Sequence, residues 1–176
     1  MGELAKYFVP DNQEGVSGRG HEIATALLSL GLRFTVDGGE EHIATYTDTT
    51  APIEIPASKH DFSFADMGIA DLSDPIPVPE VLYELLCPNC HADVTEPAHE
   101  VWQSESEVAI PDRQVPCPNC GGIVTSTHLE SPSEPFTFAR FYLWVADIDP
   151  EDWEPDFKAT LESVVGSCQE FESWET

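Results

Sequence analysis

The chain has 176 residues, 41% of them hydrophobic, which suits one folded domain or one domain with an insertion. No apolar run approaches the roughly 20 residues that span a bilayer, and the first residues lack the basic start and apolar stretch of a secretory signal. The 33 acidic residues outnumber the seven Lys and Arg residues, and the formal net charge of −26 disfavours direct binding to nucleic-acid phosphates.

The acidity has three explanations that composition leaves open. The acids form a solvated surface with no partner, or they attract a basic protein, or they reflect adaptation to high salt. The few lysines, Lys6, Lys59 and Lys158, also fit the last explanation. All three explanations describe a soluble protein whose surface repels other anions.

The first half of the chain predicts one helix among short strands. Ile23, Leu27 and Leu30 recur at helical spacing, which predicts a helix over about residues 21–30 that ends at Gly31. Apolar runs and turn signals predict strands over residues 7–9, 32–36, 42–47 and, at a sheet edge, 52–56. The polar, glycine-rich residues 11–20 predict a loop, and the proline-rich residues 57–79 predict an irregular, exposed connector.

The second half predicts a central strand and a second amphipathic helix. Residues 136–147 carry apolar side chains on both faces, which is typical of a strand inside a sheet. A helix is expected to open at Pro155, to bury Phe157, Leu161, Val164 and Val165, and to end at Gly166. Shorter strands are expected over residues 122–127 and 168–174.

The order of these elements is strand–helix–strand–strand, then strand–helix–strand. This order resembles a ferredoxin-like α+β sandwich that carries a metal module near its middle. The expected division is a first part of the α+β domain in residues 1–80, an inserted zinc ribbon in residues 81–130 and a second part in residues 131–176.

Two identical steps carry the clearest chemical signal, Cys87-Pro-Asn-Cys90 and Cys117-Pro-Asn-Cys120. Two residues between cysteines allow a tight turn that directs both sulfurs at one ion, and proline and asparagine suit such a turn. Two facing turns complete a tetrahedral site, so we predict one structural zinc ion bound by these four cysteines. Because four protein ligands leave no open position for water, the ion is expected to stabilise the fold rather than to catalyse.

This pattern resembles the zinc-ribbon or rubredoxin-like knuckle family over about residues 85–125 only. The second step, with Gly121 after its last cysteine, matches the family turn, whereas the first step has His91 where glycine is common. The resemblance implies a metal without specifying a biological role. Iron is the main rival ion, and a pair of disulfides or a thiol redox motif would use the same cysteines without a metal. The cysteine spacing favours a reducing cytoplasm.

Other candidate sites are weighed against simpler interpretations. The loop of residues 15–20 before the first helix has backbone N–H groups that suit an anion, but it lacks the residues of a phosphate loop. The acids of residues 147–152 fail the calcium-loop pattern and suit a helix start instead. His91 and His99 lie near the cysteines and are candidates to replace one of them as a ligand, whereas Cys168 is expected to be a buried, inert thiol.

Residues 147–176 hold ten acids against one base, Lys158, and also hold Trp153, Phe157, Phe171 and Trp174. These aromatics either anchor a basic partner that the acids attract, or face the core while the acids face water. Because the histidines stand at no recognisable spacing from a nucleophile, we expect no catalytic residues. The expected function is a cytoplasmic, zinc-stabilised acidic binding protein, of the inhibitor or immunity type, that caps a basic partner such as a nuclease toxin. An enzyme with an unseen pocket and an iron electron-transfer protein are the competing hypotheses.

Overall fold

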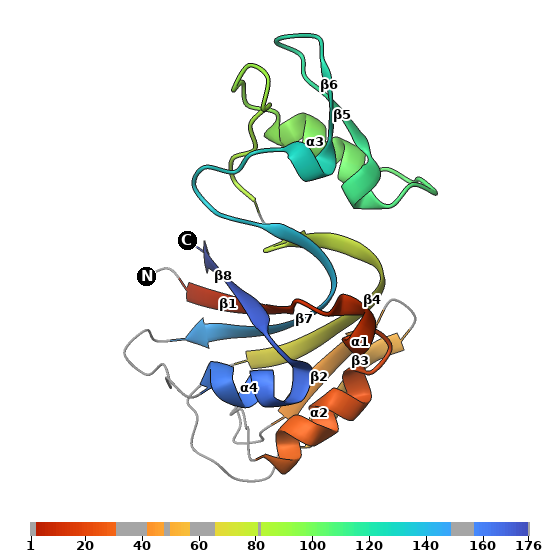
Figure 1. Ribbon diagram of the computed structural model, residues 1–176, viewed down its shortest axis with the longest axis vertical. Coiled ribbons are helices and arrows are strands. Elements are labelled where there is room, and N and C mark those ends of the chain that lie inside the picture. Colours follow the sequence, from red (N-terminus) through yellow and green to blue (C-terminus); the bar gives the residue numbers. More distant parts are fainter. Residues whose placement is uncertain are drawn as a thin grey trace. The chain divides into compact units, whose positions relative to one another are not determined.

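The computed structural model describes residues 3–30, 42–47, 50–56, 66–80, 82–148 and 157–175. They form a mixed α+β fold with a mostly antiparallel sheet and few helices (Figure 1). The chain divides into two compact units, residues 1–73 with 140–176 and residues 74–139, which are described here one at a time. The predicted division, with residues 81–130 as the insertion, stays a prediction.

A six-stranded sheet has the order β3-β2-β4-β7-β1-β8 (Figure 1). Antiparallel pairing joins β1 to both β7 and β8 and joins β2 to β3, whereas β2 and β4 run parallel. The strand bounds are β1 Glu3–Pro10, β2 His42–Thr47, β3 Thr50–Pro56, β4 Asp66–Val78, β7 Thr137–Ile148 and β8 Cys168–Glu175.

Two helices, α2 (Gly20–Ser29) and α4 (Phe157–Val165), lie side by side on one face of this sheet (Figure 1). A short helix, α1 (Gln13–Val16), precedes α2. Both long helices bury residues at the predicted spacing, except that Leu30 lies at the C-cap of α2 and is 53% exposed. The rings of Phe8 and Phe157 lie 5.6 Å apart in the core between helices and sheet. The fully buried members of this core include Ile23, Leu27, Met67, Ile69, Phe141, Leu143, Val145 and Leu161.

Most of the predicted elements in this unit are confirmed. The helix at 21–30, the helix ending at Gly166 and the strands at 7–9, 42–47, 52–56, 136–147 and 168–174 all form, with β7 inside the sheet and β3 at its edge. Residues 11–20 also contain α1, whose start is capped by the Asn12 side chain. The predicted strand 32–36, turn 37–39, Gly31 cap and Pro155 helix start lie outside the described residues.

The prediction of an exposed connector over residues 57–79 is wrong for residues 66–78, which form β4 inside the sheet. Met67 and Ile69 are fully buried, and residues 68–71 pair with β2. Pro75 and Pro77 lie beyond that paired register, where a missing N–H costs the β2–β4 ladder nothing. The prolines therefore mark the far end of the strand rather than its absence.

The second unit, residues 74–139, has a small core around a helix and a hairpin. The helix α3 (Thr95–Gln103) was not predicted, and the strands β5 (Gln114–Pro116) and β6 (Ile123–Thr125) pair antiparallel. The predicted strand over 122–127 is thus shorter, since residues 126–128 form a 3-10 turn. The buried residues of this core are Leu82, Leu85, Cys87, Val94, Ala98, Trp102, Val115, Cys117, Val124 and Leu129. Among the described residues, every helix falls short of the length and apolarity that crossing a bilayer requires.

Gly68 in β4 lies directly under the indole of Trp144 in β7. A Cβ atom at residue 68 would lie 2.4 Å from two ring carbons of that indole, far inside van der Waals contact. We expect Gly68→Ala to lower the free energy of unfolding by about 1–3 kcal/mol, because the indole must leave its place. Urea denaturation measures this change. In the double variant Gly68→Ala with Trp144→Leu, the loss of unfolding free energy should be smaller than the sum of the two single losses. A loss equal to that sum would contradict the contact between Gly68 and Trp144.

Candidate metal centre

The two Cys-Pro-Asn-Cys steps form two matching turns in the second unit. In the first turn the Cys87 N–H donates to the Ala92 carbonyl at 2.9 Å, and the His91 N–H donates to the Cys87 carbonyl at 2.8 Å. The second turn repeats both bonds, from Cys117 to Gly122 at 2.8 Å and from its glycine back to Cys117 at 3.0 Å. Identical local sequence therefore gives two equivalent turns.

The residue after each turn adopts a left-handed backbone conformation. Gly121 has φ +70°, and His91, which departs from the family pattern, has φ +53°. Only glycine takes this conformation without a steric penalty. The first turn thus keeps the geometry of the second at a cost in backbone strain. The His91 Nδ1 also lies 3.2 Å from Glu130 Oε2, at an exposed site where such a pair contributes little.

Different elements hold the two turns. The second turn is the loop of the β5–β6 hairpin, in which Val115 pairs with Val124. The first turn follows the buried Leu85, and Leu86 beside it exchanges two backbone hydrogen bonds with Glu130, at 2.7 and 3.1 Å. The second turn is therefore held by strands next to it in sequence, whereas the first turn is held by a chain segment more than forty residues away.

The four sulfurs lie at the spacing of a metal site. Their Sγ atoms are all within 4.8 Å of one another, with 3.6 Å between Cys90 and Cys117 and 4.0 Å between Cys87 and Cys120. A tetrahedral ion with Zn–S bonds of about 2.3 Å has edges of about 3.8 Å, whereas a disulfide needs about 2.05 Å. All four cysteines are free thiols. The donor set therefore fits one four-coordinate ion.

Hydrogen bonds and like charge act on these sulfurs in opposite directions. The Ala92 N–H and the Asn119 side chain donate to Cys90 and lower its pKa to about 6. The Gly122 N–H lowers the pKa of Cys120, but the neighbouring thiols of Cys117 and Cys90 outweigh it and raise that pKa to about 11. The Cys90 thiolate therefore forms easily and the Cys120 thiolate does not, and a bound cation would favour the ionised form of Cys120.

The four cysteines differ in how deeply they are buried. Cys87 and Cys117 are buried among the apolar residues of the second unit, Cys90 is half-buried and Cys120 is exposed. Gly122 makes room at the outer edge, since a Cβ there would lie 3.3 Å from the Cys120 sulfur. An ion bound here would link both turns to the small core behind them.

Within the described residues, these four cysteines are the one group of three or more Cys, His, Asp or Glu side chains that converges on a metal position. The structure places no histidine among the ligands: His99 lies on α3, and His91 pairs with Glu130. The Asn119 and Gly122 donors were missed in the sequence, although the repeated asparagine was visible there.

The loop before α2, which we weighed as an anion site and expected to be a simple helix entry, binds a carboxylate of its own chain. The Asp71 carboxylate accepts the N–H of Gly18 and the N–H of Gly20, each at 2.8 Å. Backbone N–H groups at a helix start favour negative charge, and a carboxylate satisfies them as a phosphate would. Asp71 was missed because it lies in the segment that we assigned to a connector.

The remaining sequence candidates behave as core residues. Cys168 is 6% exposed, and burial, with Glu162 and Asp11 nearby, raises the pKa of its thiol to about 12. Phe157 and Phe171 are buried, which favours the core interpretation for them, whereas Trp174 is half exposed. Trp153 and most of the acids of residues 147–152 lie outside the described residues.

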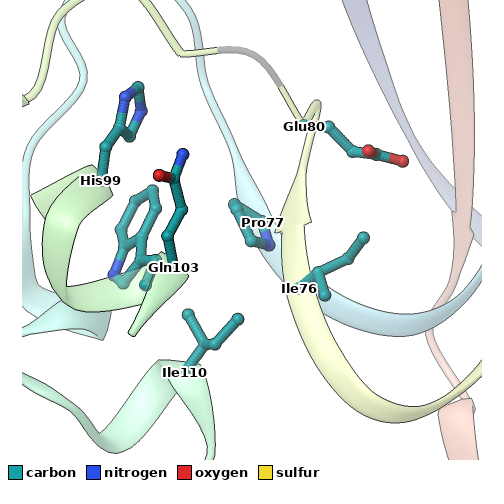
Figure 2. A pocket seen from close by; sticks show the side chains of 7 residues that line it. Ile76, Pro77, Glu80, His99, Gln103 and Ile110 are labelled. Carbon is teal, nitrogen blue, oxygen red and sulfur yellow. The ribbon is translucent and has the colours of Figure 1, made fainter. Parts of the chain in front are cut away.

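A groove of about 380 Å³ lies within the second unit, between α3 and the end of β4 (Figure 2). We call it the α3 groove; its lining residues are Ile76, Pro77, Glu80, His99, Trp102, Gln103 and Ile110. Figure 2 shows the His99 and Glu80 side chains on opposite sides of the groove, pointing away from each other. They do not form an acid–base pair, so the groove does not favour the enzymatic hypothesis.

No protein-family model, curated protein or solved structure matches this chain.

We expect the purified, reduced protein to contain about one metal ion per chain, because four sulfurs at these distances suit a single tetrahedral ion. Removal of the ion by a chelator should unfold the second unit, since a core this small depends on the bound metal for its stability. Elemental analysis measures the metal content, and hydrogen exchange measures the unfolding. Peptides from residues 82–130 should lose protection, while peptides from α2 and α4 keep it. A metal content below half an ion per chain would contradict the site. The variant Cys120→Ser should lose the metal. The control variant Cys168→Ser should keep it.

Replacement of His91 by glycine should stabilise the metal-loaded protein, because it relieves a left-handed conformation that histidine disfavours. The expected gain in the free energy of unfolding is up to about 1 kcal/mol, measured by denaturation with metal in excess. Gly121→Ala, the matched change in the other turn, should lower the same quantity by a similar amount. If His91→Gly destabilises the protein instead, the histidine side chain contributes more than its backbone strain costs.

Proposed function

We propose that this chain is a zinc-stabilised acidic protein that binds a basic protein partner, with the metal serving the fold. Its concrete form is an inhibitor or immunity-type protein that caps a basic partner such as a nuclease toxin. The closed set of four thiolates supports a structural metal, because no coordination position is left for water or substrate. Four thiolates with Zn²⁺ also leave a charge of −2, so the centre adds to the acidity rather than offsetting it.

One observation carries the proposal: each cation among the described residues is already bound within its own chain. Lys6 lies between Glu170, at 2.7 Å, and Glu172, while Lys158 lies 3.9 Å from Glu162. The exposed pairs are Arg19–Glu22 and Arg140–Glu14, at 2.6 and 2.8 Å. Arg113 donates to backbone carbonyls only. The lysines and arginines that the structure describes are thus engaged, which supports a partner that brings cations of its own.

The proposal also names the ion, the cellular compartment and the fold of the sheet. We propose zinc as the ion, since the closed sulfur set suits a structural site, and a reducing cytoplasm, which the five free cysteines support. We also propose a ferredoxin-like core. If β1, β4, β7 and β8 are its first, second, third and fourth strands, the observed order β4-β7-β1-β8 is the 2-3-1-4 order of that fold. The pair β2–β3 would then extend this core beyond β4.

The proposal predicts that a basic protein binds the metal-loaded chain and that ionic strength controls how fast it does so. Affinity capture with cross-linking from the native host identifies the partner, and an unrelated acidic domain of equal net charge is the control. The association rate constant with the purified partner should fall at least about tenfold between low salt and about 0.5 M salt. A partner that is neutral or acidic, or no protein enriched over the control, would overturn the proposal.

The same salt series separates a partner from high-salt adaptation. Stability should rise with added salt and level off by about 1 M, where the Debye length is about 3 Å and self-repulsion is screened. A chain adapted to high salt would fold only above about that concentration.

A second candidate, iron electron transfer, is favoured by the exposed position of Cys120, which brings the centre to the protein surface. The same cage of four sulfurs accepts iron. Visible absorption by the oxidised, freshly purified protein decides between the two ions, since zinc is colourless.

A further inference from the structure

The α3 groove has a floor that is fixed before any ligand arrives. The Trp102 Nε1 donates to the Ser126 hydroxyl at 2.9 Å, and the indole stands edge-on to Phe138 with ring centroids 5.8 Å apart. The Ser126 hydroxyl in turn donates to the Arg113 carbonyl at 3.1 Å. Because these contacts hold the indole in one orientation, a ligand that packs on it loses little free energy to reorganisation.

Apolar and polar groups divide the groove in a way that suits an amphipathic ligand. Ile76, Pro77 and Ile110 supply apolar surface beside Trp102, and Gln103 reaches over the groove from the last turn of α3 (Figure 2). A purely apolar ligand would leave the polar side chains unmatched, and a fully hydrated ion would gain nothing from the floor. A long side chain with an apolar stem and a polar head satisfies both parts.

Charge around the groove selects the sign of that head. Residues 74–139 contain eleven acids and one base, Arg113. Glu96 and Glu100 are exposed on α3, on the same helical face as His99 and Gln103.

Arg113 is the one Lys or Arg residue of this segment, and its guanidinium caps the end of α3. It donates to the carbonyls of Val101, Trp102 and Ser104, each at 2.9 Å, and to Val108 at 2.8 Å. Its charge therefore lies near the groove floor but offsets one acid of the eleven, which leaves the second unit strongly acidic.

We propose that the α3 groove binds an arginine side chain presented by an extended segment of a basic protein partner. The stem packs on Ile76, Ile110 and the 8% of Trp102 that is exposed, and the guanidinium lies toward Gln103 and the carboxylates of α3. Arginine suits this site better than lysine, since its planar, weakly hydrated head donates several hydrogen bonds at once, to the Gln103 amide oxygen and to the α3 carboxylates. This inference rests on the proposed function and names the surface that carries it.

Titration of the full, metal-loaded chain with three peptides tests the proposal. The peptides alternate glycine with arginine, with lysine or with citrulline, which keeps the shape of arginine without its charge. The arginine peptide should bind saturably, the lysine peptide several-fold more weakly, and the citrulline peptide not measurably. Amide NMR shifts should map to α3 and to residues 76, 78 and 110. Equal binding of arginine and lysine peptides, or shifts spread evenly over the acidic surface, would overturn the assignment.

Two charge variants provide the matched comparison. Glu100→Lys adds a cation on the α3 face beside the groove and should weaken arginine-peptide binding at least about tenfold. Glu84→Lys makes the same change at an exposed residue that does not line the groove and should alter binding by no more than about twofold. Equal losses in both variants would show that binding follows net charge alone.

The outcome for the groove is distinct from the outcome for the proposed function. If a basic protein partner binds wild type and Glu100→Lys equally, the groove assignment fails and the proposed function stands. If the arginine peptide binds the groove but no basic protein is captured from the host, the proposed function fails and the groove assignment stands.

Discussion

Mutual repulsion among four sulfurs is the constraint on which the second unit depends. The turns bring Cys87, Cys90, Cys117 and Cys120 within 4.8 Å of one another, and thiolates at that spacing cannot all ionise without a cation. The buried sulfurs also belong to the core that contains Trp102. Core packing, the capped end of α3 and the α3 groove are therefore linked to the occupancy of one ion. The first unit has its own core around Phe8 and Phe157.

Sequence periodicity predicted the first unit well wherever a pattern had a single structural meaning. The spacing of Phe157 and Leu161 fits only a helix packed on a core, and apolar residues on both faces of 136–147 fit only an internal strand. The metal ligands were predictable for the same reason, since a repeated step with two cysteines fixes both donor and spacing.

The failures have two physical origins, long-range contacts and weak local patterns. Proline was taken to break a strand, yet in β4 the pairing register with β2 ends before Pro75. The helix α3 was missed because its apolar face is narrow, with only Ala98 and Trp102 buried on it. Asp71 binds the N–H groups of Gly18 and Gly20 across 53 and 51 residues of sequence, and no local pattern indicates such a partner. Nor does the sequence show that His91 copies the conformation of Gly121.

The engagement of the described cations also limits how the chain can change. On most protein surfaces a lysine is among the most replaceable residues, because its charge is one of many and its side chain touches little. Here Arg113 holds four carbonyls, and Lys6 is buried between two glutamates. Loss of either residue removes a scarce positive charge and a structural contact together. At these two positions tolerance to substitution is therefore inverted: replacement of Lys6 or Arg113 does more harm than replacement of a lysine on an ordinary surface.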